Sequence, residues 1–230
     1  MEKYISSIND LKLGRKVAGG SCSDIFEFED NTYFKRFVSD YQDLKDPINI
    51  EFYEVIKYLS EIQGMPLIVR GQDIYRSDSK LFGYSMPIIN AKELQKLSDD
   101  ILVDDIFKGF RLLQPDIRTL AENFVKTEDV GGGNIMFNGQ MYLLDLDLSL
   151  VDKRYIPDEL YQRTINSLLC GIKQKLLNDA RRDDVVSPEQ CNEYLQLLKD
   201  VCSTGLNKEV KTIKDMKDGY QKIKTIYQKF

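Results

Sequence analysis

The chain has 230 residues, of which 42% are hydrophobic and 30% are charged, with a net charge of -5 and no histidine. This composition excludes a disordered protein, and the lack of histidine excludes a Ser-His-Asp triad, a Cys-His pair and an imidazole zinc site. The acidic balance argues against a nucleic-acid binder, and no apolar run approaches the ~18 residues of a membrane span.

The first predicted elements are three strands within residues 16–37. Residues 16–28 are expected to form a strand, a glycine-rich turn and a second strand, and residues 31–37 form the next strand, which carries Lys35. Small residues let backbone N–H groups approach a phosphate closely, and in this turn they are Ala18, Gly19, Gly20, Ser21 and Ser23. Taken alone, the turn is equally consistent with an ordinary hairpin.

A helix and more strands are predicted downstream. Residues 50–62 carry apolar side chains at 52, 55, 56, 59 and 62, which is the spacing of an amphipathic helix, and Asp46-Pro47 is its start signal. Segments 67–69, 73–75 and 81–89 are expected to complete a five-stranded sheet. The only seam between domains is predicted near residues 88–92.

Residues 129–147 carry the most informative pattern of the chain. Asp129 and Asn134 lie five residues apart, and the Asn138-Gly139 dipeptide between two apolar runs predicts a two-residue hairpin turn. Such a hairpin would fold Asp145 back toward Asn134. Carboxylate and amide oxygens would then converge on one Mg²⁺ site.

In this order, the motifs resemble those of the protein kinase-like superfamily. The resemblance covers about residues 14–170, and it implies ATP and Mg²⁺ as cofactors. Lys35 would grip the nucleotide phosphates, paired with Glu51 or, as the alternative, with Glu54. The small residues of the turn, together with Met86 and Ile88 of a hinge, would bind the nucleotide. Asp129 would orient the acceptor hydroxyl, and the implied metal ligands are Asn134, Asp145 and Asp147.

The chain also departs from that family's pattern. Gly131 stands where Ser/Thr protein kinases usually have a lysine, and the run of three glycines is closer to kinases of small molecules and lipids. Asp145-Leu146-Asp147 replaces Asp-Phe-Gly, so that Asp147 is either a second carboxylate near the metal or a polar residue in the place of a glycine. The segment of residues 149–158 is short and contains no Ala-Pro-Glu motif, which indicates that a regulatory activation segment is missing.

The C-terminal third is predicted to be helical. Residues 159–177 have helical patterning, Ser187-Pro188 predicts the start of a helix that runs to about Asp200, and residues 208–230 form a lysine-rich amphipathic helix. Those lysines are either a solvated face or a docking surface for an activating acidic partner or a membrane.

We therefore expect an α+β, bilobal kinase-like fold, with an N-lobe at residues 1–89 and a reduced, mostly helical C-lobe at 90–230. It resembles minimal kinase-like proteins of bacteria, including effectors that act on a host partner. Three functions remain open: a minimal Ser/Thr protein kinase, a kinase of a small molecule of the aminoglycoside or choline type, and a catalytically silent partner-binding module.

The start of the chain and the cysteines bear on the compartment. Residues 1–8 contain no signal-peptide core, and the four cysteines form no C-x-x-C pair. We expect buried thiols in a reducing, cytoplasmic environment, with a disulfide between two of them left open. An effector secreted through a non-classical signal would have the same features.

Overall fold

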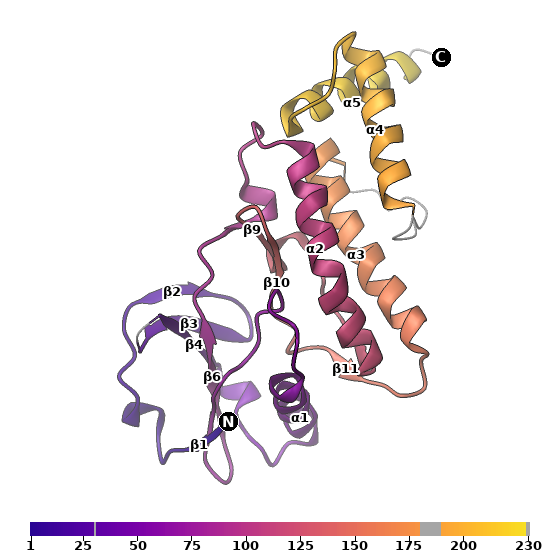
Figure 1. Cartoon of the computed structure of the whole chain (residues 1–230). Coiled ribbons are helices and arrows are strands. Elements are labelled where there is room, and N and C mark those ends of the chain that lie inside the picture. The colour runs from indigo at the N-terminus through magenta and orange to yellow at the C-terminus, as the bar shows by residue number, and fades with distance from the viewer. Residues whose placement is uncertain (30, 180–189, 229–230) are drawn as a thin grey trace. The chain divides into compact units, whose positions relative to one another are not determined.

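The computed structural model describes residues 1–29, 31–179 and 190–228 (Figure 1). The chain divides into two compact units. The first contains residues 1–64, 68–90 and 145–150, and the second contains residues 65–67, 91–144 and 151–230. The segment that begins at Asp145 thus belongs to the first unit, although the residues on both sides of it in the sequence belong to the second.

The first unit is built on a six-stranded sheet with the strand order β1-β5-β6-β4-β3-β2. Its strands are β1 (Glu2–Tyr4), β2 (Lys16–Gly19), β3 (Ser23–Phe28), β4 (Thr32–Phe37), β5 (Ile74–Arg76) and β6 (Leu81–Pro87). All neighbours pair antiparallel except β1 and β5, which are parallel. The prediction of five strands was wrong in two respects: β1 was missed, and residues 67–69 are not one of the strands of this sheet.

Helix α1 (Pro47–Glu61) begins where the sequence predicted. The Asp46 carboxylate accepts a hydrogen bond from the Ile48 backbone N–H, which caps one of the free donors of the first turn. Its buried residues include Phe52, Val55, Ile56 and Leu59, as the apolar spacing predicted. Two short 3₁₀ helices, Ile8–Asp10 and Ser39–Tyr41, complete this unit.

Aromatic rings make up part of the core of the first unit. Phe28, Phe34 and Tyr75 are buried and lie with ring centroids 5.3 to 5.7 Å apart, in tilted or edge-to-face geometry. Such pairs are worth ~1 kcal/mol beyond the area that they bury. These ring contacts link β3, β4 and β5, and they therefore help to fix β4, the strand that carries Lys35.

The second unit is mainly helical. Its helices are α2 (Val103–Glu122), α3 (Pro157–Leu177), α4 (Cys191–Leu206) and α5 (Ile213–Tyr227). Helices α2 and α3 pack side by side, and α4 packs on α5 (Figure 1). Helix α3 confirms the helix predicted at residues 159–177. Helix α2 was not predicted, although its buried residues 103, 106, 107, 110, 113, 117 and 120 have helical spacing.

Short strands complete the second unit. They are β7 (Lys92–Glu93), β8 (Val125–Lys126), β9 (Ile135–Phe137) and β10 (Met141–Leu143), with short 3₁₀ helices at Leu94–Lys96 and Gly132–Asn134. Strand β11 (Leu150–Val151) lies where the chain passes back into this unit. The predicted hairpin is β9-β10, but Phe137 pairs with Met141, so the loop has three residues rather than two, with Gly139 at φ 100°.

The C-terminal helices differ from their predicted bounds. The predicted helix start at Ser187 lies outside the described residues, and α4 runs past Asp200 to Leu206. In the lysine-rich segment, Lys208 pairs with Asp215 and Lys217 pairs with Asp99. Part of this lysine set therefore makes ion pairs within the second unit.

The four cysteines are all unpaired thiols, and the open alternative of a disulfide is not realised. Cys191 and Cys202 are buried as expected, whereas Cys22 and Cys170 are partly exposed. Among the helices of the described residues, none combines the length and the apolar character that crossing a membrane requires.

The close approach of β6 to β4 predicts a position where glycine is required. Gly83 has φ 154°, and a Cβ atom built on it would lie 2.0 Å from the carbonyl oxygen of Lys35. We expect Gly83→Ala to lower the free energy of unfolding by at least about 2 kcal/mol, because the two strands would have to separate. Urea denaturation measures this loss. Gly20→Ala is the control, since its Cβ would meet no atom within 4 Å, and equal losses in both variants would contradict the packing described here.

Candidate active site

The site in the first unit begins with the register of two strands. Lys35 on β4 lies directly opposite Tyr84 on β6, in an antiparallel pair. Directly opposite residues project from the same face of a sheet, which brings the two side chains together. The Lys35 ammonium lies 5.8 Å from the centroid of the Tyr84 ring.

Two carboxylates from a distant part of the sequence meet this lysine. Lys35 Nζ lies 2.5 Å from Asp145 Oδ1 and 2.7 Å from Asp147 Oδ2. The Tyr84 hydroxyl donates a hydrogen bond to Asp147 Oδ1 at 2.8 Å. The side chains of Lys35 and Asp147 are 6% and 8% exposed, whereas that of Asp145 is 48% exposed. The four side chains form one polar cluster, and Asp145 is its accessible member.

The electrostatics of the cluster keep the lysine charged. Burial by itself would lower the pKa of Lys35, but the negative charges of Asp147 and Asp145 outweigh it and raise that pKa above its ordinary value. Burial, followed by the charges of the same two aspartates, raises the pKa of Tyr84 well above its ordinary value. At neutral pH, the ammonium and the phenol therefore both act as hydrogen-bond donors.

The segment that carries the two aspartates has a fixed backbone. Asp145 has φ 60°, in the left-handed region that non-glycine residues rarely adopt, and the Ser149 N–H donates to the Leu146 carbonyl at 3.0 Å. Leu146 and Ser149 are buried. Strained residues of this kind are common at functional sites.

The predicted ion pair between Lys35 and Glu51 is not formed. In the described part of the chain, the ion-pair partners of Lys35 are Asp145 and Asp147. Glu51 and the alternative, Glu54, are both exposed, because the buried stripe of α1 occupies the other side of the helix. The sequence showed two carboxylates on this helix, but not that Lys35 pairs with the two aspartates at 145 and 147 instead.

The predicted nucleotide-binding residues lie on the edge strand β2 and the turn that follows it, and at the end of β6. Gly19 ends β2, Ser23 opens β3, and the Gly20 N–H donates to the Ser23 carbonyl at 2.8 Å, which closes the turn. Residues 18–21 are exposed, whereas Ser23 is buried. In the predicted hinge, Met86 is buried, and the exposed Ile88 donates its N–H to the Asn31 carbonyl at 3.3 Å.

The predicted catalytic loop lies in the second unit and is held by its own hydrogen bonds. The Asn134 amide donates to the backbone carbonyl of Asp129 at 2.9 Å, and the Gly131 N–H donates to the same oxygen at 2.8 Å. Asp129 has φ 49° and an exposed side chain. The Leu144 N–H donates to the Asn134 carbonyl at 2.9 Å, which ties the loop to the residue just before Asp145.

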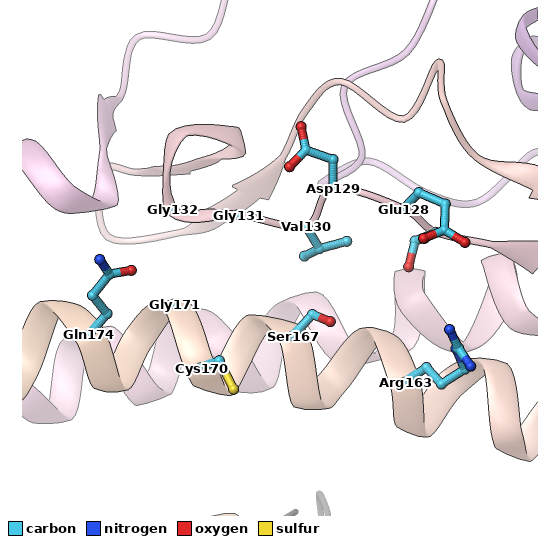
Figure 2. A pocket seen from close by; sticks show the side chains of 11 residues that line it. Glu128, Asp129, Val130, Gly131, Gly132, Arg163, Ser167, Cys170, Gly171 and Gln174 are labelled. Atoms are coloured by element: carbon cyan, nitrogen blue, oxygen red, sulfur yellow. The ribbon is translucent and has the colours of Figure 1, made fainter. Parts of the chain in front are cut away.

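A cavity of about 390 Å³ lies between this loop and α3. Figure 2 shows that Val130 points toward α3, whereas the Asp129 carboxylate extends from the opposite side of the loop. From α3, the cavity is lined by Arg163, Ser167, Cys170, Gly171 and Gln174. The Asp129 carboxylate is therefore not directed toward α3 across this cavity (Figure 2).

The predicted metal ligands are divided between the two units. Asp145 and Asp147 belong to the first, and Asn134 belongs to the second. Within the residues that the structure describes, no group of three or more acidic or cysteine side chains is gathered as a ready-made metal site.

No protein-family model and no curated protein matches this chain. Solved structures do match: one of a twitchin kinase region of C. elegans has 15% identity and a TM-score of 0.52 over 67% of this chain and 29% of that one. A second, a C. elegans twitchin kinase fragment with autoregulated kinase and immunoglobulin domains, has 15% identity and a TM-score of 0.58 over 88% and 50%. The chain has a kinase-like fold. It spans half or less of the length of these two structures.

Within the kinase-like fold, one residue of the polar cluster was missed by the sequence analysis. Tyr84 lies in a predicted strand, but its role depends on its standing opposite Lys35. That register is a property of strand pairing, which no local motif encodes. The only signal in the sequence was a tyrosine in the middle of an apolar strand.

Thiol reactivity provides a test of the burial described here. We expect two thiols, Cys22 and Cys170, to react rapidly with Ellman's reagent in the native protein, because both are partly exposed. Cys191 and Cys202 should be protected, since burial raises the pKa of each to about 11 and leaves little thiolate. In urea, all four should react. Four fast thiols in the native state, or a need for prior reduction, would contradict the structure.

Proposed function

We propose that the protein is an ATP- and Mg²⁺-dependent phosphotransferase, acting as a minimal Ser/Thr protein kinase. The observation that supports this most strongly is the buried Lys35 ammonium, paired with an aspartate 110 residues away in the sequence. A strand-borne lysine and an aspartate after a hairpin are the two parts that phosphoryl transfer in this fold uses to hold phosphates and metal.

The residues present fit a nucleotide and a magnesium ion. Lys35 offers a charged ammonium, and the exposed turn at residues 18–21 offers backbone N–H groups without bulky side chains. Asp145 offers a half-exposed carboxylate, which is a donor that Mg²⁺ accepts, and the amide oxygen of Asn134 is the other ligand that the sequence predicts. When bound, the metal would neutralise charge that develops on the phosphates.

The chain's own acid-base chemistry would come from Asp129. Its side chain is exposed, and its backbone carbonyl is held by both Gly131 and Asn134. An exposed carboxylate on a backbone held in this way can orient an acceptor hydroxyl and accept its proton. Asn134 would have two tasks, since its amide nitrogen braces the loop while its amide oxygen is left for a metal.

One observation favours a second function, a kinase of a small molecule. Gly131 occupies the position where a lysine would otherwise contact the phosphoryl group, and two more glycines follow it. The third function, a silent module, is disfavoured because Lys35, Asp129, Asn134 and Asp145 are all present. A site that only scaffolds a partner has no need of all four.

Phosphate transfer from labelled ATP tests the proposal. We expect Mg²⁺-dependent labelling of the protein itself or of a Ser/Thr-rich protein acceptor, and a loss of ~10²-fold or more in Lys35→Met and in Asp129→Asn. Asp129→Asn should retain nucleotide affinity, since its role is on the acceptor side. Lys80→Met is a matched control, because Lys80 is an exposed lysine of the same unit.

The outcomes separate the three functions. ATP turnover that appears only with an added aminoglycoside, choline or similar hydroxyl compound would favour the second function. A Lys35→Met protein with near-normal transfer would overturn the assignment of the lysine. If neither phosphate transfer nor ATP turnover is seen with any acceptor, the silent module is the function that remains.

A further inference from the structure

The kinase-like site raises the question of what holds the lysine in place. A lysine side chain has four rotatable bonds, so an ammonium that is to meet a phosphate reproducibly needs a fixed partner. Both glutamates of α1 that could serve are exposed, and neither contacts it. The residues that hold the lysine must therefore come from the polar cluster itself and not from α1.

The two aspartates at the lysine are not equivalent. Asp145 is half exposed, and its contact in the cluster is Lys35. Asp147 is buried, with one carboxylate oxygen at Lys35 and the other accepting from the Tyr84 hydroxyl. A ligand that takes over Asp145 would leave the contact between Asp147 and Lys35 intact.

Tyr84 is itself rigidly placed. Its backbone is fixed by pairing with β4 on one side and β5 on the other. Its ring packs edge-on against Phe37 at 5.8 Å, and a Cβ atom on Gly71 would lie 3.1 Å from the ring, so that a glycine there allows the close approach. The hydroxyl is thus a fixed donor, and Asp147 is held between it and the lysine.

We propose that Asp147 and Tyr84 are positioning residues that hold Lys35 for the nucleotide and leave Asp145 as the metal-binding carboxylate. This inference rests on the proposed function for its catalytic consequence. It replaces the expectation that Asp147 is a metal ligand, because one of its oxygens accepts from the Tyr84 hydroxyl and the other lies in an ion pair with the Lys35 ammonium. In this arrangement, Lys35 is held by the segment after the β9-β10 hairpin and not by α1.

Nucleotide affinity is the first test. With a fluorescent ATP analogue and Mg²⁺, we expect Asp147→Asn and Tyr84→Phe to raise Kd by about tenfold, because each removes one charge-assisted contact and keeps the shape of the side chain. The KM for ATP should rise more than kcat falls. Asp78→Asn and Tyr33→Phe are matched controls, an exposed aspartate and a tyrosine of β4. If Glu51→Gln weakens binding as much as Asp147→Asn, then α1 supports the lysine and the inference is wrong.

A second test does not depend on nucleotide binding. The test is a double-mutant cycle measured by urea denaturation. Tyr84→Phe should lower the urea midpoint of the otherwise unchanged protein. In the Asp147→Asn background, the same substitution should lower the midpoint by less than about half as much. Equal shifts in both backgrounds would show that the two side chains do not act together and would overturn the inference. If the unchanged protein binds no nucleotide but the cycle shows coupling, the proposed function fails while the link between Tyr84 and Asp147 stands.

Discussion

The burial of one ammonium group governs the arrangement of the first unit. Moving a charged group out of water costs several kcal/mol unless it is paired and hydrogen bonded. Lys35 meets that condition through Asp145 and Asp147, and Asp147 in turn accepts a hydrogen bond from the Tyr84 hydroxyl. Residues 145–150 thereby join the sheet-bearing unit while the hairpin that precedes them belongs to the other. The charge requirement thus explains how a short segment of sequence comes to lie in a different unit from its neighbours.

The pairing of the buried ammonium explains ligand binding better than it explains the stability of the fold. A buried ion pair is often no more stabilising than a well-packed apolar group of the same volume, whereas removal of one partner leaves an uncompensated charge. Apolar residues at positions 35 and 147 could build a sheet of this kind. Charged residues there are understandable if the lysine is needed for a ligand, which is the physical reason for interpreting the cluster as a site.

Local patterns predicted the elements whose signals are local. The Asp46-Pro47 start and the apolar spacing predicted α1, and the Asn138-Gly139 dipeptide predicted the β9-β10 hairpin, although with a loop one residue too short. The partner of Lys35 could not be predicted, because it depends on a contact between residues 110 positions apart in the sequence and on the register that sets Tyr84 opposite Lys35. Strand β1 was missed because three residues that pair with β5 have no pattern of their own. The roles of Asp129 and Asn134 stay predictions, since what the structure adds is the hydrogen bonding of their own loop.

Thermal unfolding with a non-hydrolysable ATP analogue, in Mg²⁺ and in a chelator, tests whether Lys35 and Asp145 form a nucleotide-metal site. A ligand at ~100 times its Kd stabilises the native state by about 2.7 kcal/mol, which corresponds to a rise in Tm of roughly 5 °C or more for a chain of this size. We expect such a rise with nucleotide and Mg²⁺ together and a clearly smaller one with the chelator. No rise at millimolar nucleotide, with or without the metal, would contradict the assignment of Lys35 and Asp145 to a nucleotide-metal site.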